Sequence, residues 1–266
     1  MGEIELSLRL RTIADMVSEG LRVADVGCDH AYISIYLLQS KRASQVTAMD
    51  IGRGPLEIAR KNIAANGLEG KIRLLLSDGT LALEKDWAEA VVIAGMGGIL
   101  IRDIIAADID RFRRLKEFIL GPQSELQLLR GFLYQEGFTI ISEKAVCEDG
   151  KFYPVIKAVP GESPMPEDFA LRYGPKLLEN KNKILKKKLY MERAKYTELA
   201  ENIKAVIRED HLSDPDEKAL KKRERLEGRL RDICRDLELN ERALDFMGED
   251  YDLQGSDGMS VGAGTL

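Results

Sequence analysis

The fold of this chain is decided by the stretch Val23-Ala24-Asp25-Val26-Gly27-Cys28-Asp29-His30-Ala31. It has the pattern of a buried strand that ends in an acid and runs through a glycine-containing turn into a helix. Such a turn places backbone N–H groups and a helix N-terminus at the carboxyl edge of a sheet, where open α/β sheets bind their ligands. The stretch therefore predicts an α/β fold with a ligand site after its first strand.

Short β-branched runs alternate with helical patterns on both sides of this stretch, which is typical of a parallel sheet covered by helices. We expect strands at 21–26, 46–49, 72–76, 90–93 and 118–120, and helices at 4–17, 31–39, 55–65, 99–109 and 124–135. Two β-rich runs, 139–146 and 152–159, flank Glu148-Asp149-Gly150, and Asp-Gly between such runs is a strong hairpin signal. The sequence thus predicts a doubly wound α/β sheet closed by an antiparallel pair.

The last hundred residues have a different character. Three prolines, a glycine and a serine within 160–166 indicate a linker. Apolar residues then recur at steps of three, four or seven in 175–209 and 213–244, which predicts an antiparallel coiled-coil hairpin, with Ser213 as an N-cap candidate. We therefore expect a ligand-binding domain at 1–160, a linker at 161–174, a helical arm at 175–250 and a disordered tail at 251–266.

The acids at the strand ends indicate the ligand. A dinucleotide site needs three glycines for the pyrophosphate, whereas only Gly27 is present, between Asp25 and Asp29. Carboxylates would repel a pyrophosphate but suit the amino group and the positive sulfonium of S-adenosylmethionine. Asp50, after the second strand, can accept from both ribose hydroxyls, and Asp78, after the third, from the adenine amino group. The pattern predicts an S-adenosylmethionine site.

The fourth strand ends in Ala94-Gly95-Met96-Gly97-Gly98, a backbone that a substrate can approach closely. Enzymes that methylate adenine N6 usually carry an Asn/Asp-Pro-Pro-aromatic run here, and its absence argues against that chemistry. His30 either caps the helix that follows or orients the ligand. Cys28 lines the turn, since methyl transfer to nitrogen needs no thiol.

The formal net charge of −5 argues mildly against a nucleic-acid partner, although the distribution of charge matters more than its sum. Five lysines crowd one end of the arm, namely Lys181, Lys183, Lys186, Lys187 and Lys188, and a second basic cluster spans 221–231. These clusters either are solvated faces or grip RNA. Three dispersed cysteines and the absence of a long apolar run predict a reduced cytoplasmic protein with no metal site and no membrane span.

Several stretches together resemble the bacterial tRNA (adenine-22-N1)-methyltransferases of the TrmK type. They are Leu6-Ser7-Leu8-Arg9-Leu10, 24–32, Gly54-Pro55, Gly79, Ile93-Ala94-Gly95-Met96-Gly97-Gly98, Glu148-Asp149-Gly150-Lys151 and Tyr173-Gly174-Pro175. The resemblance implies a Rossmann-like S-adenosylmethionine-dependent methyltransferase sheet with a C-terminal coiled-coil arm, acting on N1 of adenine 22 in the D-loop region of tRNA. The chain departs from the family at Leu120-Gly121-Pro122-Gln123, where many relatives read Leu-Gln-Pro-Asn, and at Asp50, where Glu is common.

The motifs and the resemblance together give the expected site residues. Those expected to bind the cofactor are Arg9, Asp25, Gly27, Asp29, His30, Asp50, Ile51, Asp78, Gly79, Ala94, Gly95 and Met96. Those expected to bind the substrate are Gly95, Met96, Gly97, Gly98, Lys181, Lys183 and Lys187. Asp25 and Asp29 are the expected catalytic acids.

The expected chemistry follows from adenine itself. N1 carries an in-plane lone pair in the neutral base, so it attacks the methyl group without prior deprotonation, and Asp25 or Asp29 can offset the positive charge of the product. Because N1 lies on the Watson–Crick edge, the base must be unpaired or flipped into the pocket. Two alternatives stay open: a small-molecule methyltransferase, and a scaffold that binds S-adenosylmethionine without catalysis. We expect a monomer or a weak homodimer formed through the arm.

Overall fold

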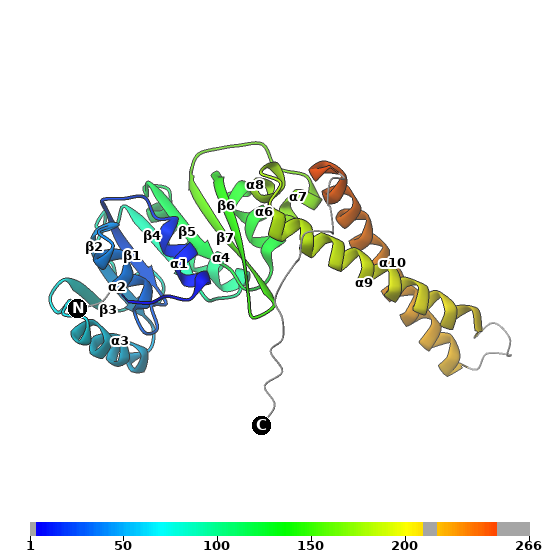
Figure 1. Ribbon diagram of the computed structural model, residues 1–266, viewed down its shortest axis with the longest axis horizontal. Coiled ribbons are helices and arrows are strands. Elements are labelled where there is room, and N and C mark those ends of the chain that lie inside the picture. The colour runs from blue at the N-terminus through cyan, green and yellow to red at the C-terminus, as the bar shows by residue number, and fades with distance from the viewer. Residues whose placement is uncertain (1–3, 210–216, 249–266) are drawn as a thin grey trace, which may run out of the picture.

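The computed structural model describes residues 4–209 and 217–248, in which seven strands form one sheet (Figure 1). The strand order is β3-β2-β1-β4-β5-β7-β6. The strands are β1 (Leu21–Val26), β2 (Ala43–Asp50), β3 (Ile72–Leu76), β4 (Ala90–Ala94), β5 (Glu117–Gly121), β6 (Phe138–Glu148) and β7 (Lys151–Pro160). β1 to β5 run parallel, whereas β7 runs antiparallel to both β5 and β6. The predicted α/β sheet and its closing antiparallel pair are confirmed.

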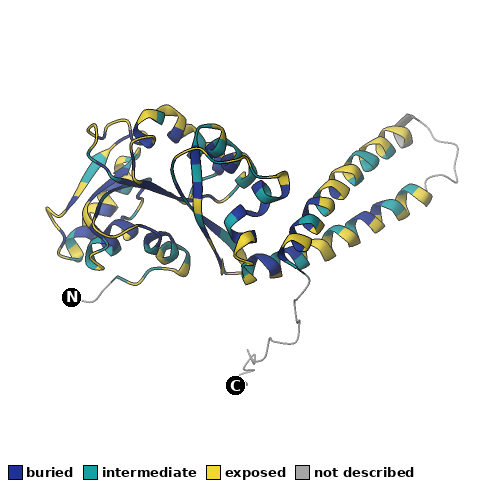
Figure 2. Cartoon of the chain, turned by 90° about the horizontal axis from the view of Figure 1, so that it is seen from above, coloured by how far each residue is buried: buried dark blue, intermediate teal, exposed yellow. Residues whose placement is uncertain are grey.

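Helices cover both faces of the sheet (Figure 2). They are α1 (Leu8–Asp15), α2 (Tyr32–Gln39), α3 (Arg53–Ala65), α4 (Gly98–Ala107), α5 (Ile109–Phe112) and α6 (Leu126–Gln135). Successive side chains of a strand point to opposite faces, so Val23 packs into the core beneath α1, α2 and α3, and Ala24 into the core beneath α4, α5 and α6. The strands of the parallel sheet are therefore buried on both faces, as their continuous apolar runs predict.

Two predicted helices differ in extent. The opening helix begins only at Leu8, because the Ser7 side chain accepts a hydrogen bond from the Leu10 backbone N–H and caps the helix there. The preceding residues, Ile4 and Leu6, pack against the core. The helix expected at 99–109 is split at Asp108, whose carboxylate accepts hydrogen bonds from Thr80 and Arg111.

The range expected to be a linker, 161–174, contains a helix that belongs to a third hydrophobic cluster. This helix is α7 (Asp168–Tyr173), and it is followed by α8 (Pro175–Glu179), α9 (Lys183–Glu209) and α10 (Glu217–Met247). Phe169 and Tyr173 are buried there against the start of α9 and the end of α10. The long helices α9 and α10 pack side by side and form the arm that projects from the sheet (Figure 1). The start of α9 and the end of α10 are thus both held in this third cluster, which forms the root of the arm.

A buried ion pair joins this root to the sheet. Arg130 of α6 and Glu143 of β6 are both 0% exposed, with Nε and Oε1 2.8 Å apart. The Arg130 guanidinium also donates to the carbonyls of Leu171 and Arg172, and Glu143 accepts from the Lys176 backbone N–H. The pair therefore links α6, β6, α7 and α8 at one point.

The turn of the arm and the tail expected at 251–266 lie outside the described residues. Within the described part, no helix is both long and apolar enough to cross a membrane.

Candidate functional site

A cavity of about 580 Å³ opens at the carboxyl ends of the parallel strands. Every residue expected to bind the cofactor lies on its wall, from Arg9 in α1 to Met96 after β4. The structure also places on this wall several residues that the sequence analysis did not select, namely Leu10, Val26, Tyr32, Ile33, Ser77, Leu100, Ile104 and Gln123. Ser77 and Gln123 follow strands β3 and β5. A search for neutral polar residues at strand ends, as well as for acids, finds both of them.

The turn after β1 has the backbone geometry that the glycine predicts. Gly27 has a φ of +70°, and a Cβ built on it would lie 2.0 Å from Cε of Met96. Asp29 and Ala31 also have positive φ values, and Ala31 is the N-cap of α2. The turn thus bends sharply twice and leaves the backbone of Gly27 accessible from the cavity.

Asp25 is the most strongly perturbed carboxyl of the site. It is 3% exposed, and the Ser34 hydroxyl donates a 2.6 Å hydrogen bond to its Oδ2. Burial raises the pKa of Asp25 to about 6, against the lowering effect of the hydrogen bonds from Ser34, and the nearby Asp50 raises it further. A cationic ligand in the cavity would favour the ionised form of this group.

Asp50, at the end of β2, is held by two backbone donors. Its carboxylate accepts from the N–H of Gly52 at 2.8 Å and from that of Asp29 at 3.3 Å. The next residue, Ile51, lines the cavity with 71% of its surface exposed, which is unusual for a large aliphatic side chain. A flat apolar group that covered Ile51 would bury this surface, and the hydroxyls of a ribose would reach Asp50.

His30 does not cap α2, because Ala31 occupies the N-cap position and no side chain bonds to it. Its ring stacks on Tyr32 with centroids 5.5 Å apart, and its Nε2 lies 3.4 Å from the Asp29 carboxylate. Cys28 is buried beside three acids, and burial raises the pKa of its thiol far above the ordinary value. The Cys28 thiol therefore stays protonated and lines the cavity.

The residues of the β4–α4 turn have two different surroundings. Gly95 and Met96 line the cavity, as expected. Gly97 and Gly98 do not: a Cβ on Gly98 would lie 2.6 Å from the backbone oxygen of Ser124, and the Gly98 N–H donates to that oxygen at 3.0 Å. These two glycines allow the β4–α4 turn to pack against the turn after β5 and do not line the first cavity, so their contact with the substrate stays a prediction.

Arg9 reaches the cavity from α1, which covers the same face of the sheet as α2 and α3. Its guanidinium lies over the ring of Tyr153 in β7, 5.1 Å from the centroid, and its backbone N–H donates to Glu148 at the hairpin tip. The cavity wall carries this one Arg and no Lys among its described residues, against the carboxyls of Asp25, Asp29, Asp50 and Asp78. The site is therefore suited to a ligand with net positive charge and one carboxylate.

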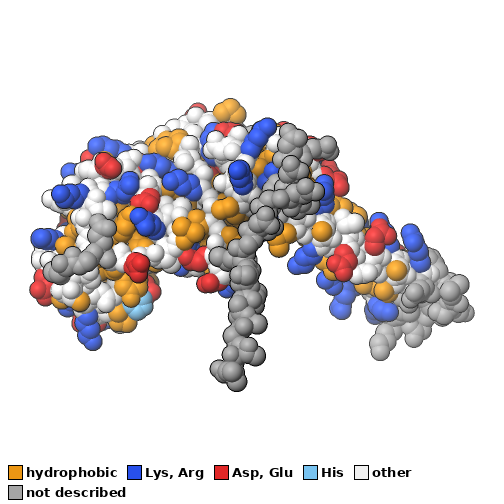
Figure 3. All heavy atoms as spheres, in the orientation of Figure 1, with side chains coloured by type: hydrophobic (Ala, Val, Ile, Leu, Met, Phe, Trp, Pro, Cys, Tyr) orange, Lys and Arg blue, Asp and Glu red, His pale blue; other side chains and the backbone are white. Residues whose placement is uncertain are grey.

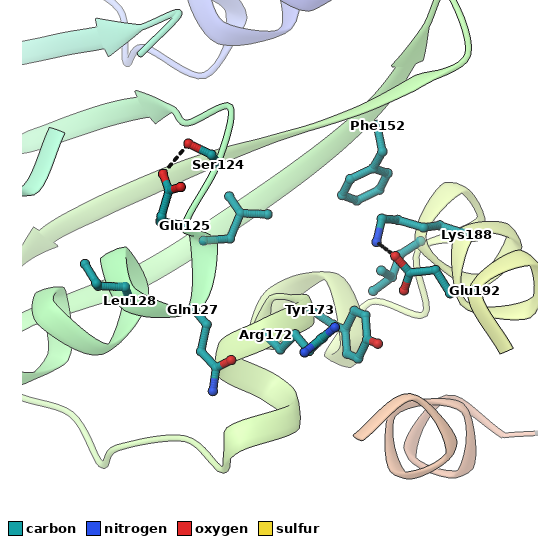
Figure 4. A pocket seen from close by; sticks show the side chains of 11 residues that line it. Ser124, Glu125, Gln127, Leu128, Phe152, Arg172, Tyr173, Lys188 and Glu192 are labelled. Carbon is teal, nitrogen blue, oxygen red and sulfur yellow. Dashed lines mark hydrogen bonds and ion pairs between the residues drawn. The ribbon is translucent and has the colours of Figure 1, made fainter. Parts of the chain in front are cut away.

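A second cavity of about 610 Å³ lies between the start of α6 and the root of the arm (Figure 4). Ser124 and Glu125 line it from the sheet, and Phe152 and Lys188 from β7 and α9. Ser124, which lines this cavity, directly follows Gln123, which lines the first. Among the described residues, no group of three or more His, Cys, Asp or Glu side chains is arranged to hold a metal ion.

The five lysines of the arm have different surroundings. Lys186 is buried, and its Nζ donates to the backbone oxygen of Gly248 at 2.7 Å. Lys188 turns toward the second cavity, where its Nζ lies 5.3 Å from the ring centroid of Phe152 (Figure 4). Lys181, Lys183 and Lys187, the three expected to bind the substrate, are exposed, and none of them lines either cavity.

Comparison with known proteins agrees with this geometry. The model of the TrmK family, tRNA (adenine(22)-N(1))-methyltransferase, matches residues 23–233. The enzyme of that name from Bacillus subtilis is 35% identical over 197 residues, 72% of this chain and 83% of that protein. The crystal structure of the B. subtilis m1A22 tRNA methyltransferase TrmK matches with a TM-score of 0.71 and 29% identity, covering 91% of this chain and 99% of that one.

A second solved structure, M. capricolum TrmK in complex with the cofactor product S-adenosyl-homocysteine, matches with a TM-score of 0.68 and 26% identity. The match covers 88% of this chain and 98% of that chain. The family match begins in β1 and ends within α10, so it includes most of the cavity wall and most of the arm. The chain therefore belongs to the TrmK family of tRNA (adenine(22)-N(1))-methyltransferases.

Proposed function

We propose that this chain transfers a methyl group from S-adenosylmethionine to N1 of adenine 22 in the D-loop region of bacterial tRNA. The observation that carries the proposal is the acid-lined cavity at the carboxyl ends of β1 to β4, in a chain that belongs to the TrmK family. Ligands bind at this edge of open α/β sheets.

The residues present fit S-adenosylmethionine. Asp25, which has no cation among the groups that shift its pKa, supports the binding of the ammonium and sulfonium charges. Asp50 is placed for the ribose hydroxyls, the exposed Ile51 for the face of the adenine ring, and Asp78 for its amino group. Arg9 is placed for the carboxylate of the methionine part. When bound, S-adenosylmethionine supplies a methyl group on a positively charged sulfur.

The methyl transfer needs no general acid or general base from the protein. The N1 lone pair of adenine forms the new N–C bond as the C–S bond breaks, and no proton leaves the base in this step. Positive charge moves from sulfur to the adenine ring. The protein therefore acts by positioning the base in line with the methyl group and by excluding water, which is worth several kcal/mol.

Asp25 and Asp29 are the proposed catalytic acids, and their geometry differs. Asp25 is buried beneath the turn, whereas Asp29 is an exposed residue of the cavity wall, beside His30. A carboxylate close to the reacting atoms stabilises the positive charge wherever it develops. The exposure of Asp29 makes it the better placed of the two to face the product cation.

The arm is the proposed second contact with tRNA. Lysine and arginine side chains lie among carboxylates along it (Figure 3), and Lys181, Lys183 and Lys187 are exposed at its root. The second cavity lies between this root and the first cavity. An RNA strand that contacts both the arm and the methyl-transfer site would cross it, with Phe152 available for stacking.

The location and oligomeric state are part of the proposal. A tRNA substrate and three free cysteines, Cys28, Cys147 and Cys234, support a cytoplasmic protein. The apolar residues of the arm, Ala200, Ile203 and Ile233, are buried between α9 and α10 of the same chain, which supports a monomer rather than a homodimer formed through the arm.

The test is to incubate the protein with tritiated S-adenosylmethionine and unmodified tRNA that carries adenine at position 22, then to digest the RNA and identify the labelled nucleoside. We expect label in 1-methyladenosine and none when position 22 is a pyrimidine. Tight cofactor binding without label in any RNA would reject the proposal. It would favour a small-molecule substrate, or a scaffold if no methyl acceptor were found.

A further inference from the structure

The substrate side of the first cavity offers few hydrogen-bonding side chains. The side chains proposed to contact the cofactor come from α1 and from the ends of β1, β2 and β3, so the space for the target base lies toward β4 and β5, the next strands of the sheet. The residues of the β4–α4 and β5–α6 segments that line the cavity are Ala94, Gly95, Met96, Leu100, Ile104 and Gln123. Of these, Gln123 alone has a nitrogen or oxygen in its side chain.

The position of Gln123 is fixed, and its carboxamide is free. Its backbone N–H donates to the backbone oxygen of Met96 at 2.9 Å, which ties the turn after β5 to the turn after β4. Its side chain is exposed on the cavity wall and makes no hydrogen bond to any described residue. A fixed backbone that carries a side-chain donor and acceptor without partners in the protein is suited to recognising a planar polar ligand.

We propose that the Gln123 carboxamide reads the target adenine through its N6 amino group and N7. This inference rests on the proposed function, because N1 must face the methyl group, which leaves the neighbouring Hoogsteen edge of the base, with N6 and N7, available for recognition. A Gln carboxamide pairs with this edge in two bonds: Oε1 accepts from N6–H, and Nε2–H donates to N7.

The same geometry discriminates against guanine. Guanine presents two acceptors on this edge, O6 and N7, so the amide oxygen would face a lone pair. Gln123 is therefore the side chain that selects adenine.

The bond to N6 also strengthens during the reaction. Methylation at N1 makes the N1–C6–N6 unit an amidinium, so the N6–H group gains positive character as the N1–C bond forms and the C–S bond breaks. A carbonyl oxygen that accepts from N6–H is then bound more tightly in the transition state than in the ground state, and such contacts raise kcat. Loss of Gln123 should lower kcat as well as RNA affinity.

The test combines protein variants with base analogues. Wild type, Gln123→Ala and Gln123→Glu are assayed on ligated tRNA that carries adenosine, purine riboside, which lacks the N6 amino group, or 7-deazaadenosine, which lacks N7, at position 22. Wild type should lose about tenfold to a hundredfold in kcat/KM on each analogue. Gln123→Ala should be slower on adenosine by a similar factor, and the ratio of the wild-type rate to its rate should fall toward one on either analogue.

The Glu variant separates the two bonds, since a carboxylate accepts from N6–H but repels N7. It should remain sensitive to loss of the amino group and should be at least as active on 7-deazaadenosine as on adenosine. The analogues change the intrinsic nucleophilicity of N1, but this effect is common to all variants and cancels in the ratio of their rates.

Two controls keep the result specific. Gln127→Ala removes another carboxamide in the second cavity and should retain the wild-type pattern of discrimination. S-adenosylmethionine affinity should be unchanged in Gln123→Ala. If Gln123→Ala discriminates among the three bases as wild type does, the inference is wrong, whereas failure of wild type to methylate any tRNA would instead reject the proposed function.

Discussion

A single buried carboxyl group couples cofactor binding to pH. Asp25 has a pKa of about 6 in the folded protein and 3.8 as a reference, so the folded state holds its proton more tightly. The stabilisation of the folded state by the protonated Asp25 is fully present below pH 3.8 and is lost as the pH rises through 6. Above that pH, the buried negative charge lowers the free energy of unfolding. A cationic ligand offsets this loss.

The affinity for S-adenosylmethionine should therefore weaken in acid. Between pH 7.5 and pH 5 the dissociation constant of the wild type should rise about tenfold, because most Asp25 is then protonated in the free protein. Isothermal titration at several pH values measures this change. Asp25→Asn should bind more weakly at pH 7.5 and show a flatter profile, and a flat profile in the wild type would contradict the role of Asp25.

Gly27 allows a second prediction at this scale. Gly27→Ala introduces a Cβ directly against Met96 and strains a backbone with φ of +70°. We expect at least a tenfold loss of cofactor affinity and a loss of about 1 kcal/mol in the free energy of unfolding. Gly20→Ala is the matched control, since φ is +82° there and nothing lies within 4 Å. It should lose similar stability and keep wild-type affinity.

At the level of elements, the strands and their ends could be predicted because a doubly buried strand needs a continuous apolar run and a turn signal. The acids Asp25, Asp50 and Asp78 followed from this pattern, whereas Arg9, in a helix, did not. What could not be predicted depends on partners distant in sequence. Asp108 divides a helix because Thr80 and Arg111 donate to it, and the burial of Lys186 depends on the carbonyl of Gly248.

The range 161–174 shows the same limit. Its prolines indicate irregular backbone, but its fold depends on Arg130, which binds two carbonyls of α7 from α6. Gln123 could not be predicted for another reason. It carries no charge, so the pattern of acids at strand ends does not include it, although its carboxamide can recognise a ligand as well as a carboxylate can.

Gly174 is the tightly packed glycine at the root of the arm. A Cβ there would lie 2.8 Å from Oε2 of Glu143 and 3.0 Å from Nη2 of Arg130, and its φ is +105°. Gly174→Ala should lower the free energy of unfolding by about 2–4 kcal/mol, because it combines backbone strain with displacement of a buried ion pair. Chemical denaturation measures this loss. Gly131→Ala, in the open middle of α6, should instead stabilise the protein by about 0.5–1 kcal/mol.

Across the whole molecule, net negative charge coexists with a basic arm. If the arm holds tRNA, Lys183→Glu/Lys187→Glu should weaken tRNA binding about tenfold or more at low salt and reduce the slope of log affinity against log salt by about two. Filter binding at several salt concentrations measures both quantities. The affinity for S-adenosylmethionine should not change.

Lys71→Glu/Lys85→Glu, a double charge reversal at exposed residues outside the arm, makes the same change in net charge and is the control for total charge. Loss of tRNA affinity in that variant alone would place the RNA on another face. Equal affinity in all variants would leave the arm with a purely structural role.

The root of the arm also has a mechanical consequence. α9 contains 27 residues and is therefore about 40 Å long. Its first turns, with Leu185 and Leu189, and the last turns of α10, with Leu244 and Met247, pack into the cluster at the root. By simple leverage, a tilt of about 5° at the root would shift the far end by about 3.5 Å over that length. The stiffness of one small joint, built from Arg130, Glu143 and Gly174, thus sets how accurately distant parts of a bound tRNA are held relative to the methyl group.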